Sequence, residues 1–570
     1  MLFKLRKKYL ASIPTLALSC ALVTLIVTLG LMAGVPPVDR DALTHHLYVP
    51  KLYLAQGGIV ELPQIVFSYF PMNLDLLYMI VLYFGNDIAP KYLHFAFGLA
   101  TALLVYRYTV SRFGAVNGLL GALLFLSIPV IAKLCVTVYV DLGLIFFSTA
   151  GLLALLRWMR EGLTPRYLII GGLCCGLAAG CKYNGLITIF ILSAFVPFMY
   201  QRSQPVTKRS DVKAIAQLGI FLSAVLLTFS PWLIRNALWT GNPLFPLYGT
   251  IFQNTTQVSM SENEDNADSG PSQMVKKLSG TNSNLFYQRK LLYGENFYQI
   301  LLLPIRFFYQ GKDDDPRFFD GKLNPFLLFF SFLPLCYRSQ YEAGQRREHN
   351  YLLAFALLYF FLSFFSETQR VRYVSPMLPP LVILSVAGIS SLFRQLRNGI
   401  QIRNAVMCYG AIALVSGMYL YNVHYLTQLF SRIEPLSYLS GKLSREEYIS
   451  LRRPEYPLVK YINENIPENS VILAVFLGKR GYYFDRKVYF DSLTGKDSLT
   501  TMARSATDGE GIARSLRDNK INYILIRNDM FQQWITARLS KNEVVRLEEF
   551  FQNFTVIVSR SKDHLLFKIL

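Results

Sequence analysis

The chain has 570 residues, of which 52% are hydrophobic and only 16% are charged, and its formal net charge is +20. This composition excludes an ordinary soluble protein, because several apolar runs approach the roughly 20 residues that cross a bilayer as a helix. The basic excess does not indicate nucleic-acid binding. The basic residues cluster in short loops between apolar segments, as topology signals and phospholipid contacts do.

The N-terminus combines a basic segment (residues 4–8) with an apolar run over 13–35. This pattern resembles a secretory signal, but the run is too long and lacks a clear small-residue cleavage site. We therefore expect it to be the first transmembrane helix, with the N-terminus in the cytoplasm.

Apolar runs predict eleven transmembrane helices, at 13–34, 91–108, 114–132, 137–156, 167–181, 185–200, 214–233, 324–337, 351–365, 376–393 and 404–422. The segment 72–86 is short and contains Asp75, and we expect it to lie in the membrane interface. Loops rich in Arg and Lys then face the cytoplasm, whereas a crossing at 72–86 would invert every downstream loop against the positive-inside rule. The loops 35–90 and 236–322 fall on the outer face, and residues 1–425 form one membrane domain.

Residues 426–570 have a different pattern, which predicts an extracytoplasmic α/β domain. Helices are expected at 454–465 and 509–519, strands at 470–476, 487–490 and 522–526, and a closing hairpin at 554–560 with 565–569. No phosphate-binding glycine motif occurs in it, and the basic turn 478–481 is interpreted as a loop.

Charged residues gather where the chain should leave the bilayer on the outer side. Asp39, Asp41, His45 and His46 follow the first apolar run directly. Acidic side chains avoid hydrocarbon unless a function holds them nearby, so this segment is typical of an active site at the outer surface of a membrane enzyme.

Metal and disulfide sites have little support. The seven cysteines lie in or beside apolar segments and form no disulfide or CxxC pattern. Adjacent histidines on a helix point about 100° apart, so hydrogen bonding of His45 and His46 to sugar or to Asp41 is favoured over a divalent metal. Asp313–Asp315 reads as a solvated turn, with calcium binding as the alternative.

Two segments of the long outer loop differ in character. Residues 254–284 are polar and poor in aromatic residues, which is typical of a mobile loop. Residues 297–309 are apolar and aromatic, and we expect an interfacial helix there.

Several short motifs occur in a characteristic order. They are residues 39–59, the Phe70-Pro71 turn, Tyr139–Leu142, Gly180–Gly185, Arg235-Asn236 with Gly241–Pro246, and Gln369–Tyr373. Through them the chain resembles the glycosyltransferase C (GT-C) superfamily. Its nearest resemblance there is to bacterial relatives of protein O-mannosyltransferases and of the lipid A aminoarabinose transferase. The resemblance covers residues 1–425. The C-terminal domain resembles one that some of these proteins carry.

The resemblance implies a polyprenyl-phosphate-linked sugar donor and a catalytic carboxylate in the first outer loop. Asp41 matches that carboxylate best, and Asp39 is the second choice. The sequence departs from the family pattern at two places. Ala42 follows Asp41, where the family commonly has an acidic residue. Phe70-Pro71 stands where the relatives have a turn with a phosphate-binding lysine or a histidine.

Roles follow for the remaining charged residues. Cations should surround a phosphate leaving group, and the candidates are Lys182, Arg370 and Arg372, whose alternative role is contact with lipid headgroups. Asp141 either supports the site or caps its helix, and Asp41 could likewise cap a helix that begins at Ala42. Tyr373, His45 and His46 are expected to contact substrate.

We therefore expect a membrane glycosyltransferase, in a bacterial inner membrane, that uses undecaprenyl phosphate as carrier and an envelope glycan, lipid or protein as acceptor. The alternatives are a transporter or flippase of lipid-linked glycans and a non-catalytic subunit of an envelope assembly complex.

Overall fold

The computed structural model describes residues 2–204, 208–249, 251–252, 285–366, 369–397, 402–491 and 498–570. The predicted mobile loop at 254–284 lies outside these residues. The chain forms two compact units. The helical unit comprises residues 1–35, 64–254 and 295–436, and the C-terminal unit comprises residues 36–63, 255–294 and 437–570. The predicted first outer loop, 35–90, is therefore divided between the two units.

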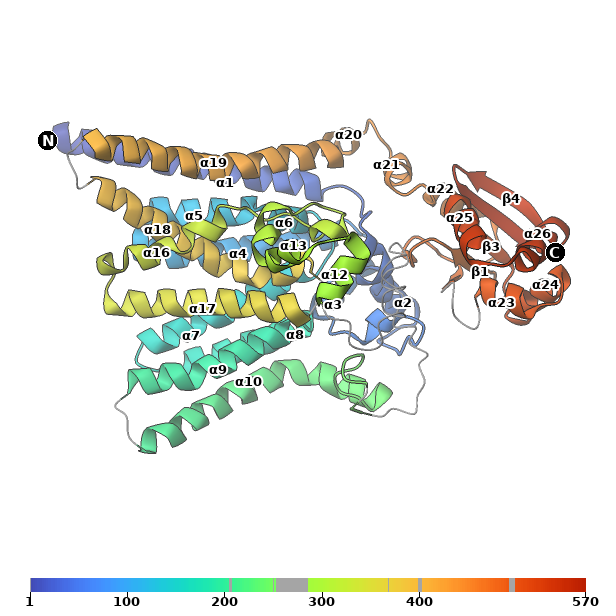
Figure 1. Ribbon diagram of the computed structural model, residues 1–570, viewed down its shortest axis with the longest axis horizontal. Coiled ribbons are helices and arrows are strands. Elements are labelled where there is room, and N and C mark those ends of the chain that lie inside the picture. The colour runs from blue at the N-terminus through green and yellow to red at the C-terminus, as the bar shows by residue number, and fades with distance from the viewer. Residues whose placement is uncertain are drawn as a thin grey trace. The chain divides into compact units, whose positions relative to one another are not determined.

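The described residues of the helical unit form α-helices and 3₁₀ turns, without a β-strand. Its α-helices are α1 (Leu2–Ala33), α3 (Asn73–Tyr83), α4 (Ala89–Phe113), α5 (Ala115–Ser127), α6 (Pro129–Cys135), α7 (Asp141–Arg160), α8 (Pro165–Cys181), α9 (Gly185–Ser203), α10 (Lys208–Thr240), α13 (Phe297–Leu301), α14 (Leu303–Tyr309), α15 (Leu327–Phe330), α16 (Leu333–Cys336), α17 (Ala343–Ser366), α18 (Leu378–Arg397) and α19 (Ile402–Ile433). The 3₁₀ turns are η2 (Val66–Tyr69), η4 (Pro316–Phe318), η5 (Arg338–Gln340) and η6 (Val371–Met377). The axes of the long helices of this unit are roughly aligned with one another (Figure 1).

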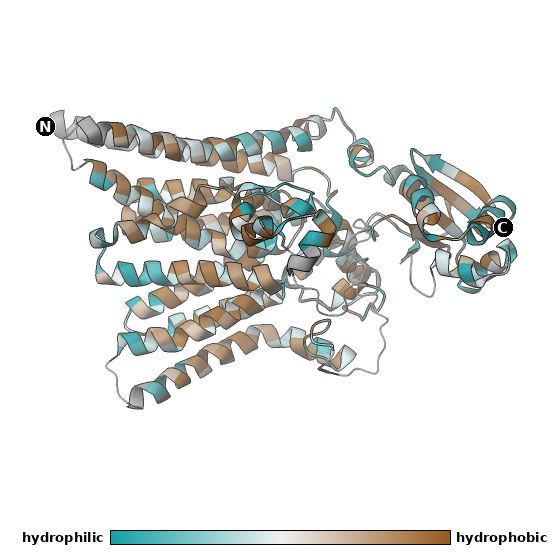
Figure 2. Ribbon diagram, viewed as in Figure 1, coloured by the Kyte–Doolittle hydropathy of each residue, from teal (hydrophilic) through white to brown (hydrophobic). Residues whose placement is uncertain are grey.

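Eight helices of the described residues are long and apolar enough to cross a membrane. Figure 2 shows that apolar residues dominate their middle lengths, with polar residues gathered toward the ends. The expectation of a polytopic helical membrane protein is therefore confirmed. Three shorter apolar helices, Asn73–Tyr83, Pro165–Cys181 and Leu327–Cys336, accompany them, and the total of eleven crossings stays a prediction.

Proline interrupts one predicted span. The run 114–132 divides into α5 and α6, which are bent by 72° at the break. Pro129 begins α6, and a residue before proline is disfavoured in helical conformation, so the extended backbone of Ile128 ends α5. The bend leaves Lys133 in a short helix of its own.

Glycines allow α8 to approach α10 closely. A Cβ at Gly172 would lie 2.5 Å from the backbone oxygen of Phe221, and one at Gly176 would lie 2.3 Å from that of Val225. Small residues are the usual means of bringing two membrane helices together. This contact fixes the position of α8, whose last residue precedes Lys182.

The C-terminal unit contains the α/β domain that the sequence predicts. Its helices are η1 (Ala42–His46), α2 (Tyr48–Ala55), α12 (Leu285–Tyr293), α21 (Arg445–Arg452), α22 (Tyr456–Asn465), α23 (Leu499–Ser505), α24 (Gly509–Asp518), α25 (Asn528–Arg538) and α26 (Lys541–Asn553). Its strands are β1 (Val471–Val475), β2 (Lys487–Phe490), β3 (Tyr523–Arg527), β4 (Thr555–Ser561) and β5 (His564–Ile569). The helix α20 (Pro435–Leu439) lies where the chain passes from one unit to the other.

The five strands form one sheet in the order β2-β1-β3-β5-β4. The first three strands are parallel, and β4 and β5 form the predicted antiparallel hairpin. Alternate residues of β1 face opposite sides, as the period of a strand requires. Leu473 and Val475 pack with α23–α26, whereas Ile472 and Ala474 pack with α22. The sheet is therefore covered on both faces.

Candidate active site

The acidic segment, residues 39–46, lies in the C-terminal unit and leads into a π-helical turn. Asp41 precedes η1 and already has helical backbone angles, and its carboxylate makes no capping hydrogen bond. The predicted alternative role of Asp41 as a helix cap is therefore wrong. The turn is closed by the backbone N–H of Leu47, which donates to the Ala42 carbonyl at 2.9 Å. Before it, the N–H of Leu43 donates to the Asp39 carbonyl at 3.1 Å, and Thr44 Oγ1 donates to the Asp41 carbonyl at 3.3 Å. Single π-helical turns occur frequently at functional sites.

The two histidines lie side by side at the end of this segment. The ring centroids of His45 and His46 are 4.0 Å apart with the planes tilted by 51°. His45 Nδ1 is 2.8 Å from Thr44 Oγ1. Among the described residues, no group of three or more His, Cys, Asp or Glu side chains is arranged to hold a metal ion.

A buried ion pair forms the centre of the site in the helical unit. Asp141 is the first residue of α7, which Val140 precedes as N-cap, so the predicted capping role of Asp141 is wrong. Instead, Lys182 Nζ donates to Asp141 Oδ1 at 2.9 Å. The aspartate side chain is 1% exposed and the lysine side chain 19%. Asp141 Oδ2 is buried without a hydrogen-bond partner among the described residues. Lys182 is therefore the more exposed partner of this pair.

Aromatic rings lie against Lys182 of this pair and against Arg372. Lys182 Nζ lies 4.4 Å from the centroid of the Tyr373 ring. The guanidinium of Arg372 lies 4.8 Å from the Tyr139 ring and 5.2 Å from the Tyr373 ring. Such cation–π contacts hold the Arg372 guanidinium without neutralising it, whereas Lys182 is also paired with Asp141. The predicted site residues Asp141, Lys182, Arg372 and Tyr373 therefore come together, with Tyr139 as an added member. We call these five residues the Asp141 cluster.

His94 on α4 orients the start of α7, and sequence reasoning did not select it. Its Nε2 accepts a hydrogen bond from the backbone N–H of Leu142 at 3.0 Å. Its Nδ1 lies 2.9 Å from the Leu134 carbonyl and 3.0 Å from the Thr137 carbonyl. An accepting Nε2 and a donating Nδ1 define a neutral imidazole. The available signal was a histidine inside an apolar span, where polar residues are costly.

Two sequence motifs meet at the Tyr69–Pro71 turn. Arg235 Nη2 donates to the Tyr69 carbonyl at 2.6 Å and to the Phe70 carbonyl at 3.1 Å. Asn236 Nδ2 donates to the Tyr69 carbonyl at 2.8 Å and to Tyr183 Oη at 3.0 Å. The Arg235-Asn236 motif therefore links this turn to Tyr183, the residue after Lys182.

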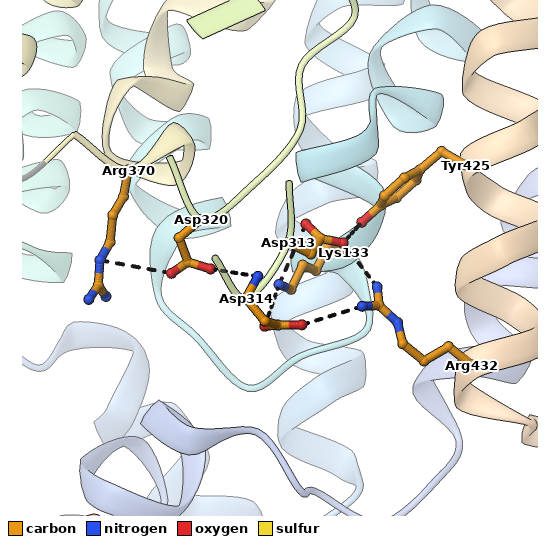
Figure 3. A network of polar contacts seen from close by, with 7 residues as sticks. All are labelled: Lys133, Asp313, Asp314, Asp320, Arg370, Tyr425 and Arg432. Atoms are coloured by element: carbon orange, nitrogen blue, oxygen red, sulfur yellow. Dashed lines mark hydrogen bonds and ion pairs between the residues drawn. The ribbon is translucent and has the colours of Figure 1, made fainter. Parts of the chain in front are cut away.

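Arg370 belongs to a separate polar network, which Figure 3 shows and which we call the Asp313 network: Lys133, Asp313, Asp314, Asp320, Arg370, Tyr425 and Arg432. Arg370 Nε is 3.8 Å from Asp320 Oδ2. Lys133 Nζ is 3.1 Å from Asp314 and 3.6 Å from Asp313. The network links α6, α19, the residues on both sides of η4, and Arg370, which precedes Arg372 by two positions.

Asp313 is the buried centre of this network. Tyr425 Oη donates to its carboxylate at 2.6 Å and Arg432 Nη2 at 2.9 Å. Its side chain is 7% exposed, against 71% for Asp314. The prediction of a solvated turn was therefore wrong for Asp313 and holds for Asp314. Burial raises the pKa of the Asp313 carboxyl, but Lys133, Tyr425 and Arg432 outweigh burial, so this pKa lies below its usual value.

Asp313→Asn is expected to destabilise the protein by about 2 kcal/mol at pH 7, the scale of a hydrogen bond to a charged group. A carboxyl whose pKa is lowered in the folded state stabilises that state above its unfolded pKa, about 3.9, and loses this effect as the pH falls through the folded value. The difference between wild type and variant should thus shrink below about pH 4. Thermal unfolding of the detergent-solubilised protein across pH 3–8 measures it. Asp314→Asn is the exposed control. An equal loss of thermal stability in both variants would contradict the role of Asp313 as the buried, stabilising carboxylate.

Comparison with known proteins identifies the fold. Residues 72–234 match the profile of a family described as dolichyl-phosphate-mannose-protein mannosyltransferase. No curated protein matches the chain significantly. The crystal structure of ArnT from Cupriavidus metallidurans in the apo state has a TM-score of 0.54 at 12% identity, over 96% of both chains.

Two further solved structures are similar. ArnT from the same organism bound to undecaprenyl phosphate has a TM-score of 0.52 at 12% identity, again over 96% of both chains. The oligosaccharyltransferase AglB from Archaeoglobus fulgidus, in complex with an inhibitory peptide and a dolichol-phosphate, has a TM-score of 0.50 at 12% identity, over 92% of this chain and 71% of that one. The resemblance to the GT-C superfamily is thereby confirmed at the level of the fold, and the protein is a multi-pass membrane protein.

Proposed function

We propose that this protein is a membrane glycosyltransferase that transfers a sugar from a polyprenyl-phosphate carrier to an envelope acceptor. The observation that carries this proposal is the Asp141 cluster. It presents a lysine and an arginine, held by aromatic rings, in a fold shared with proteins that were solved with undecaprenyl phosphate or dolichol-phosphate. A phosphate ester with a long apolar tail matches both the cations and the lipid-facing helices around them.

The reaction needs a base and a stabilised leaving group. A hydroxyl or amine of the acceptor attacks the anomeric carbon, its proton passes to the base, and the bond from that carbon to the phosphate oxygen breaks. The polyprenyl phosphate leaves with the electron pair of that bond. Asp41 is the proposed base, with Asp39 as supporting carboxylate. His45, His46 and Tyr373 are the proposed sugar contacts.

Lys182 and Arg372 are proposed to stabilise the charge that develops on the departing phosphate. Arg370, which pairs with Asp320, is proposed as a further phosphate-binding cation. Asp141 holds Lys182 Nζ at 2.9 Å and thereby fixes its position. The cation is thus placed before the donor binds, which removes the cost of ordering a lysine side chain during the reaction.

The proposed location is a bacterial inner membrane, with the N-terminus in the cytoplasm, eleven crossings and the C-terminal domain in the periplasm. This orientation follows the distribution of Arg and Lys over the loops. Undecaprenyl phosphate is the proposed carrier, and a glycan, a lipid or a protein of the envelope is the acceptor.

Mass spectrometry of lipids that co-purify in mild detergent tests the donor class. Wild-type protein is expected to retain a polyprenyl phosphate, and Arg372→Gln is expected to retain several-fold less because a phosphate contact is lost. Arg394→Gln is the matched control, since Arg394 is exposed in the last turns of α18, the helix that follows η6. Absence of any polyprenyl lipid from the wild type would contradict the proposal. Intact lipid-linked oligosaccharide in all three samples would favour a flippase.

A further inference from the structure

The C-terminal domain forms hydrogen bonds with the backbone on both sides of the two proposed catalytic carboxylates. Before Asp39, Arg453 Nε donates to the Val38 carbonyl at 2.6 Å, and Tyr483 Oη donates to the Pro37 carbonyl at 2.7 Å. After Asp41, the Leu43 carbonyl accepts a hydrogen bond of 3.1 Å from the backbone N–H of Tyr482, in the turn 481–485. All of these residues belong to one compact unit.

Lys51 on α2 strengthens the same attachment. Its ammonium donates to the carbonyls of Tyr482 and Phe484, each at 2.9 Å, and to Asp485 Oδ1 at 2.8 Å. An ammonium has three hydrogens, so the turn occupies all of them. A Cβ at Gly481 would lie only 2.4 Å from the Tyr48 ring, so the turn and that ring are in direct contact.

The turn is itself held rigidly by α22. Asn463 Nδ2 donates to the Tyr483 carbonyl at 2.8 Å, and Asn463 Oδ1 accepts from the Asp485 backbone N–H at 2.9 Å. Arg480 pairs with the buried carboxylate of Glu455 at 2.7 Å. Because α22 packs on the sheet, the bonds to residues 37–43 connect the acidic segment to the core of the domain.

We propose that Arg453 and Tyr483 are positioning residues that set the direction of Asp39 and Asp41. This inference rests on the proposed function. Few backbone bonds separate the Pro37 and Val38 carbonyls from Asp39 and Asp41, so loss of these anchors lets both carboxylates shift. A displacement of 1 Å at a catalytic group costs up to about 100-fold in rate. The C-terminal domain would then position the two catalytic carboxylates.

The test compares Tyr483→Phe, the double variant Tyr483→Phe/Arg453→Met, and Arg453→Lys, which keeps a donor. Tyr489→Phe is the control, because it is the same substitution on β2 of the same domain. The double variant is expected to lower kcat about 10- to 100-fold, to leave KM for sugar-loaded undecaprenyl phosphate within about twofold, and to speed hydrogen exchange of amides 39–47. Arg453→Lys should have a kcat between that of the double variant and that of the wild type. The control Tyr489→Phe should have the kcat of the wild type.

Two results would overturn the inference. One is unchanged hydrogen exchange over 39–47 in the double variant, because the bonds would then not hold the segment. The other is an unchanged kcat in the double variant when the wild type transfers sugar. Failure of the proposed function gives a different result, since the wild type itself would then transfer no sugar, while the exchange measurement would still decide whether Arg453 and Tyr483 hold the segment.

Discussion

Asp41→Asn is expected to lower the rate of sugar transfer by about 10²- to 10⁴-fold, the usual contribution of a general base. The amide has nearly the shape of the carboxylate but cannot accept a proton from the acceptor. The Asp41 side chain makes no capping bond to η1, so the substitution removes no helix cap. The measurement is the ratio of sugar-loaded to spent polyprenyl phosphate that co-purifies with each protein, which should rise in the variant.

Asp39→Asn is the matched control, two residues earlier in the same segment. If Asp39 only supports the base, this variant should lose much less activity. A larger loss in Asp39→Asn would exchange the two roles. No effect of Asp41→Asn, together with loss of function when residues 430–570 are removed, would favour the non-catalytic subunit.

Lys182→Met is expected to destabilise the helical unit by about 3 kcal/mol or more, because it leaves the Asp141 carboxylate buried without its cation. The aspartate is 1% exposed and Oδ2 already lacks a hydrogen-bond partner among the described residues, so the lost bond to Oδ1 cannot be replaced by water at little cost. The thermal midpoint of the protein in detergent measures this effect.

The double variant Asp141→Asn/Lys182→Met separates the structural role of Lys182 from its proposed role in binding phosphate. Removing both charges should reverse most of the decrease in thermal midpoint that Lys182→Met causes. Replacing both partners of a buried ion pair destabilises a protein far less than removing one of them. Retention of polyprenyl phosphate should stay low, because the cation is still missing. Recovery of both stability and lipid would limit Lys182 to a structural role, and a strictly additive loss of stability would show that the pair is not coupled.

Much of the architecture was predictable from local patterns. Apolar runs located the long helices, and alternation of strands and helices after residue 430 located the five strands, including the hairpin of β4 and β5. Both signals depend on residues a few positions apart. The run 114–132 was predicted as one helix, so neither the break before Pro129 nor its 72° bend was anticipated; hydropathy alone does not report how α6 packs.

The candidate site was predictable only in part. Lys182, Arg372 and Tyr373 were selected as charged or aromatic residues at helix ends, and the fold brings them to Asp141. Their partners could not be assigned, because hydropathy says where a helix lies in a membrane but not which neighbours it contacts. His94 was missed for this reason, since its bond to the Leu142 backbone joins two different helices.

The sequence by itself determined the class of the protein, the positions of its helices and strands, and the residue types available for phosphate and proton chemistry. These properties follow from composition and short periods along the chain. Only the tertiary structure decided that Asp141 binds Lys182, that Asp313 is buried among Lys133, Tyr425 and Arg432, and that residues 36–63 pack with the C-terminal domain. Those pairings join residues from about 40 to more than 400 positions apart, and the packing of whole helices and sheets selects them.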